Sequence, residues 1–445
     1  MKKILSIVLV FVLAVSLCSC GGDGFTRKVR VEGSIFGGDS GSVKTKLKFD
    51  PLWLTEGDNT VYSSDIASFA ALLSADVYFR EKDLARGTQN RVLIKGLDPE
   101  DYTWTTMLSD LGFTDVRHIE SVNDAEYETD SNDSVTLNLG YMQSGDCDIY
   151  VAAVRGCFSS GEWISAFDPG ADTAEYTEYT GTHPEWINRQ NFKGVDIASA
   201  RAVQYINSFI SEHEDASRKG CILVTGHSRG ASIAQIVGAG LEKADIKSFA
   251  YTFNSTPCTC DADAENCSSI FNIVDDSDFL GNLFSFADEP TYRYGKTLHV
   301  KSIGDFLSED MITEYSWLFA RHFADRASLY QPEYITINFD DKTAADARVA
   351  ELESIVSAET GLGLESLCSV YRPGDYSVEI SYCGAAQLQC IGKVLAYGDT
   401  AAQASLQLFG GDVEFCNIID FISSHSAEIS AGHQLKNTYD LCKKL

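Results

Sequence analysis

The sequence predicts an α/β fold, in which a mostly parallel central sheet is flanked by helices. Four short apolar runs have the length and composition of buried strands, and they lie at residues 148–154, 221–224, 248–253 and 269–274. Segments with helical spacing lie between the earlier runs, and strands that alternate with helices form parallel sheets joined by crossovers. The chain of 445 residues is 44% hydrophobic, so it is large enough to bury the core of such a sheet.

The remaining elements follow from the spacing of apolar residues. In chain order they are a packed helix at 66–78, a half-buried strand at 135–141, a helix at 196–210 that leads into the strand at 221–224, and a helix at 343–356. The region 281–424 contains no internal repeat, and we interpret it as insertions and closing elements of the same domain.

The most informative stretch is Gly220 to Leu241, GCILVTGHSRGASIAQIVGAGL. Its apolar strand breaks at Gly226-His227-Ser228-Arg229-Gly230, and apolar residues then recur at helical spacing. A strand, a sharp turn and a helix with a serine at the apex form a nucleophile elbow. The glycines on either side allow the serine a strained backbone, and the helix N-terminus behind it favours negative charge. We therefore expect Ser228 to be a nucleophile, with an ordinary turn serine as the alternative.

A serine hydroxyl needs a base to take its proton, and the base needs a third group to orient it. After a nucleophile elbow the acid comes next in the chain and the histidine last. Three acids follow the strand at 269–274, namely Asp275, Asp276 and Asp278. Chain order or spacing disfavours six of the eight histidines, which are His118, His183, His213, His227, His299 and His322. His433, in a loop before a terminal helix, is favoured over His425.

Three of these segments resemble the class 3 lipases, a family of α/β-hydrolases. They are LVTGHSRG at 223–230, VAAVRGC at 151–157 and NIVDDSDF at 272–279, and the His433-Gln434 pair also fits. The resemblance implies an α/β-hydrolase fold with Asp278 as the acid. It further implies that the backbone N–H groups of Arg229 and Cys157 form the oxyanion hole. Cys157 stands where the family usually has Thr or Ser, so help from a side-chain hydroxyl is not expected there.

The first residues resemble a bacterial lipoprotein signal. Lys2-Lys3 precede the apolar run 4–17, and Cys18-Ser19-Cys20 follows. This pattern predicts a signal peptide at 1–19 and lipidation of Cys20, with a plain signal peptide or a short membrane anchor as the alternative. We expect a flexible tether over 20–45, a hydrolase domain over 46–445, and a location in the bacterial cell envelope.

The formal net charge is −29, and it becomes −31 without the two lysines of the signal. Such a charge disfavours both nucleic acid and anionic lipid headgroups as partners, so near a membrane we expect the lipid tether and apolar contacts to hold the protein. Eleven cysteines remain after Cys18 and Cys20, and an odd number cannot all pair. Cys258, Cys260 and Cys267 lie close together in sequence, but their spacing fits a surface loop better than a zinc or calcium site. We expect no metal and no cofactor, and the sequence does not indicate an oligomeric state.

The sequence therefore predicts a lipid-tethered serine hydrolase of carboxylic esters, such as acylglycerols or other lipid esters. Two alternatives remain open. One is a non-catalytic surface lipoprotein that binds a ligand on a hydrolase scaffold, and the other is an esterase of acylated polysaccharide. An acidic, aromatic segment over 167–186 is compatible with a lid or with a sugar platform.

Overall fold

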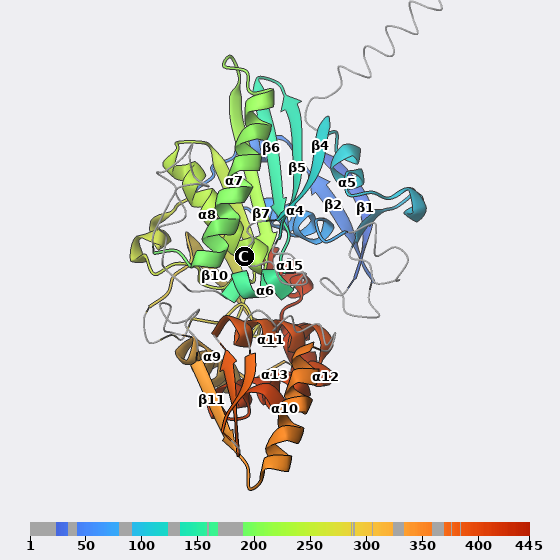
Figure 1. The fold of residues 1–445 in the computed structure, drawn as a ribbon. Coiled ribbons are helices and arrows are strands. Elements are labelled where there is room, and N and C mark those ends of the chain that lie inside the picture. The colour runs from blue at the N-terminus through green and yellow to red at the C-terminus, as the bar shows by residue number, and fades with distance from the viewer. Residues whose placement is uncertain are drawn as a thin grey trace, which may run out of the picture.

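The fold is seen in a computed structural model of the chain (Figure 1). The residues that it describes are 24–33, 42–79, 91–122, 134–157, 160–167, 190–285, 287, 290–304, 306–323, 333–357, 369–374, 376–382 and 384–445. The expected signal peptide, Cys20, His183 and nearly all of the acidic aromatic segment lie outside these residues.

The central sheet has seven strands in the order β10-β9-β8-β7-β6-β5-β4. Their bounds are β4 (Asp115–Val122), β5 (Ser134–Ser144), β6 (Cys147–Val154), β7 (Lys219–His227), β8 (Ser248–Phe253), β9 (Ile270–Asp275) and β10 (Lys296–Val300). Neighbours from β6 to β10 are parallel, whereas β4, β5 and β6 pair antiparallel. The structure thus confirms the predicted α/β class and the mostly parallel sheet.

Helices cover both faces of this sheet, as Figure 1 shows. On one face α7 (Lys193–His213) and α8 (Arg229–Lys243) pack in a shared apolar cluster with the central strands. On the other face lie α4 (Ser64–Asp76) and α15 (Leu435–Cys442), together with the short helices α3 (Leu52–Thr55) and α5 (Thr106–Asp110). The central strand β6 is buried along its whole length, as its nearly continuous apolar sequence predicts.

A second sheet lies near the N-terminus, where the sequence predicts a tether. Its order is β2-β1-β3, with β1 (Phe25–Glu32), β2 (Ser42–Phe49) and β3 (Arg91–Ile94). The prediction of a flexible tether over 20–45 is therefore wrong for residues 25–32 and 42–45. The reason is an alternation of buried and exposed positions: Val29 and Val31 are buried, while Lys28 and Arg30 are exposed and charged. The charges make the segment look like a linker in composition.

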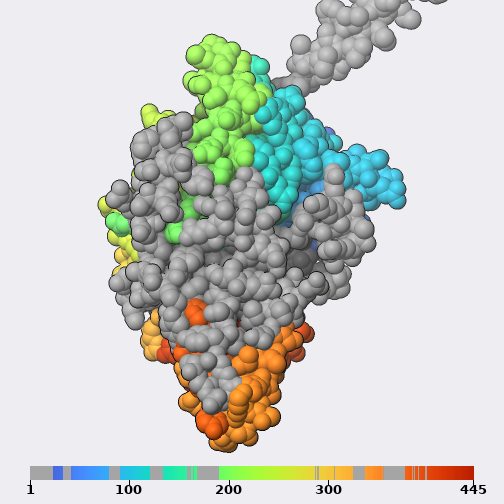
Figure 2. Space-filling model, viewed as in Figure 1, coloured from blue at the N-terminus to red at the C-terminus, as the bar shows by residue number. Residues whose placement is uncertain are grey.

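The region 281–424 first adds β10 to the central sheet and then forms a lobe, drawn in orange and red in Figure 1. The antiparallel sheet β11-β13-β12 consists of β11 (Glu333–Asn338), β12 (Ser369–Gly374) and β13 (Ser377–Tyr382). The helices are α9 (Glu309–His322), α10 (Lys342–Ser357), α11 (Gly384–Tyr397), α12 (Asp399–Phe409) and α13 (Val413–Ser424), and α14 (Ser426–Gly432) follows the region directly. Figure 2 shows α10, in orange, at the lower end of the molecule.

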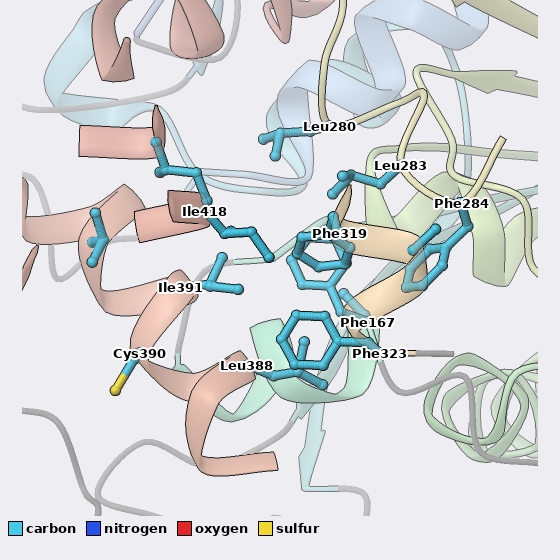
Figure 3. Packing of buried hydrophobic residues seen from close by; sticks show 14 of the residues in the cluster. Phe167, Leu280, Leu283, Phe284, Phe319, Phe323, Leu388, Cys390, Ile391 and Ile418 are labelled. Carbon is cyan, nitrogen blue, oxygen red and sulfur yellow. The ribbon is translucent and has the colours of Figure 1, made fainter. Parts of the chain in front are cut away.

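The lobe and the central sheet share one apolar core (Figure 3). Phe167 of α6 (Ser160–Phe167) and Leu280, Leu283 and Phe284, which follow β9, pack there with side chains of α9, α11 and α13. This core fixes the turn after β9, which carries Asp278.

Candidate active site

The predicted nucleophile lies in a strained turn between β7 and α8. Strand β7 ends at His227, α8 begins at Arg229, and Ser228 between them has a φ of 59° and a ψ of −132°. A non-glycine residue in such a conformation costs roughly 1–3 kcal/mol. The turn also needs small neighbours, because a Cβ at Gly226 would lie 2.2 Å from the Gly230 carbonyl oxygen and a Cβ at Gly230 would lie 2.3 Å from that of Val154. The predicted strand, turn and helix are confirmed, together with the room that the two glycines provide.

The predicted acid and the predicted histidine meet in the structure. Asp278 is fully buried, and its Oδ2 lies 2.8 Å from Nδ1 of His433, which sits between α14 and α15. The amide of Leu280 donates to Oδ1 of the same carboxylate at 3.0 Å. Since a carboxylate oxygen accepts, Nδ1 carries the imidazole proton and Nε2 carries the lone pair. Nε2 is buried and has no hydrogen-bond partner among the described residues.

Nε2 of His433 therefore accepts no hydrogen bond from the hydroxyl of Ser228 in the residues that the structure describes. His433 nevertheless lies beside the elbow, because its ring is 4.7 Å from the ring of His227, the residue before Ser228. Hydrogen bonds between a nucleophile and its base are often long without substrate and shorten when substrate binds.

The two residues predicted to form the oxyanion hole lie on either side of the serine. Arg229 is the first residue of α8, and Cys157 follows Gly156 in the turn after β6. A Cβ at Gly156 would lie 3.1 Å from the Cβ of Ser228, so the backbone of this turn runs directly beside the serine. The turn is anchored by Arg155, whose guanidinium lies 2.9 Å from the carboxylate of Glu162 on α6.

A buried hydrogen-bond chain, which sequence reasoning missed, joins Tyr78 to His433. Nε2 of His227 lies 2.9 Å from the carbonyl oxygen of His433, and Nδ1 of His227 lies 3.1 Å from the hydroxyl of Tyr78. A Cβ at Gly156 would lie 2.1 Å from that hydroxyl, so Tyr78 also packs against the backbone of the turn. Burial holds the pKa of His227 well below its usual value, so its imidazole is neutral. A carbonyl can only accept, so Nε2 of His227 carries the proton and Nδ1 accepts from Tyr78.

Two other histidines that follow the elbow, His425 and His299, have different hydrogen-bond partners. Nδ1 of His425 lies 3.0 Å from the carbonyl oxygen of Phe421, one turn earlier on α13. His299 lies 2.7 Å from Asp276 and is more than half exposed. The structure thus pairs Asp278 with His433 rather than with His425.

Within the described ranges, no group of three or more His, Cys, Asp or Glu side chains could hold a metal ion. Of the cysteines that lie close together in sequence, Cys258 is buried and donates its thiol to Oε1 of Gln235 at 3.6 Å. Burial raises the pKa of this thiol to about 12, which keeps it protonated. No helix in the same ranges is both long and apolar enough to cross a membrane.

Comparison with known proteins finds similar solved structures but no similar sequence. The sequence matches no family model, and no curated protein matches it. A triacylglyceride lipase from Rhizomucor miehei is similar with a TM-score of 0.34 and 18% identity over 54% of this chain and 82% of the lipase. Lip2 lipase from Yarrowia lipolytica gives 0.34 and 15% over 54% and 79%. A triacylglycerol lipase from Penicillium expansum gives 0.30 and 16% over 43% and 71%.

These scores are too low to carry an argument about function. The α/β-hydrolase fold is instead evident in this chain itself, in its sheet order and in the strained serine between β7 and α8.

Proposed function

We propose that this protein is an exported serine hydrolase of carboxylic esters, with acylglycerols or related lipid esters as substrates. The observation that carries the proposal is the pair formed by Asp278 and His433, in which the free nitrogen Nε2 is buried beside the elbow. A buried imidazole nitrogen with a lone pair and no partner is the group that a serine nucleophile requires.

In the proposed mechanism Ser228 attacks the ester carbonyl carbon while Nε2 of His433 takes the hydroxyl proton. The resulting imidazolium is stabilised by the carboxylate of Asp278, which already accepts from Nδ1. The carbonyl oxygen becomes an oxyanion, and the backbone N–H groups of Arg229 and Cys157 are the donors proposed to stabilise it. Each such donor contributes roughly 3 kcal/mol to lowering the barrier.

The tetrahedral intermediate then collapses, and His433 gives its proton to the leaving alcohol. The acyl group stays on Ser228 until a water molecule, deprotonated by the same Nε2, attacks it. The carboxylic acid leaves and the serine regains its proton, so the enzyme returns to its starting state. The strained backbone of Ser228 supports this cycle because it holds the hydroxyl at the N-terminus of α8.

We further propose that lipidation of Cys20 tethers the enzyme to a bacterial membrane. The support is the sequence pattern of a basic start, an apolar run and a cysteine before Gly21-Gly22. A tether of this kind would bring the active site to lipid esters without a membrane-spanning helix.

Labelling with a fluorophosphonate probe and hydrolysis of nitrophenyl esters test the catalytic proposal. We expect Ser228 to be labelled and Ser228→Ala to abolish both labelling and hydrolysis. An ester series of increasing chain length then defines the acyl group that is preferred. Full hydrolysis by Ser228→Ala would refute the mechanism, and absence of labelling would indicate a binding protein. Cleavage of acylated polysaccharide in preference to lipid esters would refute the proposed substrate class.

A further inference from the structure

One face of the N-terminal sheet is basic, although the protein as a whole is acidic. In the β1–β2 pairing Lys28 is opposite Lys46 and Arg30 is opposite Lys44, and Lys48 follows on the same face of β2. All five side chains are exposed. Residues two apart on a strand lie about 7 Å from each other and neighbouring strands about 5 Å apart, so these cations form a compact patch. We call these five residues the basic face.

The opposite face of the same sheet is apolar and packs on the hydrolase body. Val29 and Val31 of β1 and Leu47 and Phe49 of β2 are buried, and the ring of Phe49 lies 4.8 Å from that of Phe69 on α4. This packing fixes the orientation of the sheet. The basic face must therefore point away from the body.

Little within the protein balances these charges. Arg30 forms an ion pair with Glu32 at 2.7 Å, but none of the four lysines has an ion pair with the residues that the structure describes. Like charges opposite each other on paired strands destabilise a sheet. Four lysines left unpaired in a protein of net charge −29 indicate a surface for an anionic partner.

We propose that the basic face docks on the surface of an anionic lipid bilayer. The proposal builds on the lipid tether, because Cys20 is five residues before Phe25, the first residue of β1. Five residues span at most about 18 Å, so a lipid at Cys20 would hold the sheet within that distance of the headgroups. Phosphate headgroups supply the negative charge that the lysines lack.

The acidic remainder of the protein restricts this docking to one orientation. Charges on the surface are screened over a Debye length of about 8 Å at physiological ionic strength, so the lysines nearest the headgroups dominate. Repulsion of the acidic body would turn it away from the membrane and so favour the same orientation. Lysines on an edge strand also prevent aggregation, but Lys28 and Arg30 lie on β1, between β2 and β3.

Acylation of lysine amines on the full-length chain in vesicles tests the proposal. The vesicles contain neutral phosphatidylcholine alone or with roughly a third of anionic phosphatidylglycerol, a composition chosen to make the surface negative. At low salt we expect Lys28 and Lys46 to react about tenfold more slowly on anionic than on neutral vesicles. High salt should abolish the difference. Lys243 and Lys342, which are exposed elsewhere, should react equally on both.

A variant separates docking from the tether. In Lys28→Gln/Lys46→Gln/Lys48→Gln, docking should weaken about fivefold for each lysine removed, so the protection of Lys44 should disappear. The matched control replaces three exposed lysines elsewhere, Lys219, Lys243 and Lys342, by Gln and should keep the protection of Lys44.

Equal acylation on the two vesicles, or protection that survives the triple substitution, would overturn the proposal. So would protection by a soluble polyanion such as duplex DNA where anionic vesicles give none. Fluorophosphonate labelling of Ser228 on the same samples reports the catalytic proposal independently, since it requires no contact with the basic face.

Discussion

The hydrogen-bond chain through Tyr78 leads to a prediction that can be worked out from the structure. Tyr78→Phe keeps the buried ring and removes one hydroxyl, so it creates no cavity of note. The hydroxyl donates to Nδ1 of His227, and this imidazole is buried. The substitution therefore leaves one buried polar group without a partner.

A buried polar group left unsatisfied costs about 1–3 kcal/mol, so Tyr78→Phe should lower the free energy of unfolding by about 1–3 kcal/mol. It should also lower kcat, because His227 would no longer be fixed between the hydroxyl of Tyr78 and the carbonyl of His433. A misplacement of about 1 Å in a catalytic group can cost roughly 100-fold in rate, and we expect a loss of about ten- to 100-fold with little change in KM.

Urea unfolding followed by tryptophan fluorescence gives the stability, and nitrophenyl ester hydrolysis gives kcat and KM. The matched control is Tyr62→Phe, which removes a hydroxyl that donates to the carbonyl oxygen of Cys442 at 2.5 Å, away from the elbow. The control should lose about 1 kcal/mol of stability and keep its kcat. If Tyr78→Phe loses less than about 0.5 kcal/mol and keeps its kcat within about twofold, the chain of hydrogen bonds does not hold the site.

Three further predictions concern the acid, the base and a buried carboxyl. Gly281→Ala should lower kcat about tenfold or more, measured by ester hydrolysis, because the new Cβ would lie 2.5 Å from Oδ2 of Asp278 and displace it. His433→Ala should abolish hydrolysis, whereas His425→Ala should leave it within about threefold of the unchanged protein. Burial raises the pKa of Asp76 to about 7, so the folded state holds this proton more tightly than the unfolded state does. Stability should therefore fall as the pH rises from about 4 to about 7, and Asp76→Asn should reduce that fall in urea midpoints measured at pH 5 and pH 8.

Each of these predictions has an outcome that contradicts it. Gly220→Ala is the control for the glycine, since a Cβ there would come no closer than 3.9 Å to another residue, and equal loss in both variants would show a general effect of alanine. A greater loss of ester hydrolysis in His425→Ala than in His433→Ala would assign the role of the base to His425 instead. If Asp76→Asn leaves the change of stability between pH 5 and pH 8 as it is, another titratable group causes that change.

The elbow could be predicted from the sequence because it is local. The strand at β7, the glycines at 226 and 230 and the helical spacing of α8 lie within 25 consecutive residues, and each imposes its conformation on the next. The choice of the catalytic acid could be narrowed to three aspartates for the same reason, since all three follow β9 directly. Choosing among the three required the resemblance, because spacing alone does not show which carboxylate turns towards a histidine 155 residues later.

Tyr78 could not be found in this way. It lies 149 residues before His227, and a single tyrosine at the end of a helix carries no pattern. The N-terminal sheet was missed for a different reason. Its apolar residues alternate with lysine and arginine, and a high content of charged residues is also typical of a linker, so composition alone conceals the period of two. The signals that could have identified it are the run VRV at 29–31 and the run KLKF at 46–49, in each of which buried apolar residues alternate with exposed cations.

The same sheet also contacts the part of the chain that carries His433. The hydroxyl of Tyr439 on α15 lies 2.6 Å from Oγ1 of Thr45 on β2. At the other end of this segment, a Cβ at Gly432 would lie 2.6 Å from the carbonyl oxygen of Ser277, so the backbone just before His433 is held against the acid turn. The histidine is thus fixed between the acid turn on one side and a helix that rests on β2 on the other. Because β2 also carries three of the lysines of the basic face, the surface proposed to dock on lipid and the proposed base share one packed unit, in which β2 cannot shift without disturbing the helix that follows His433.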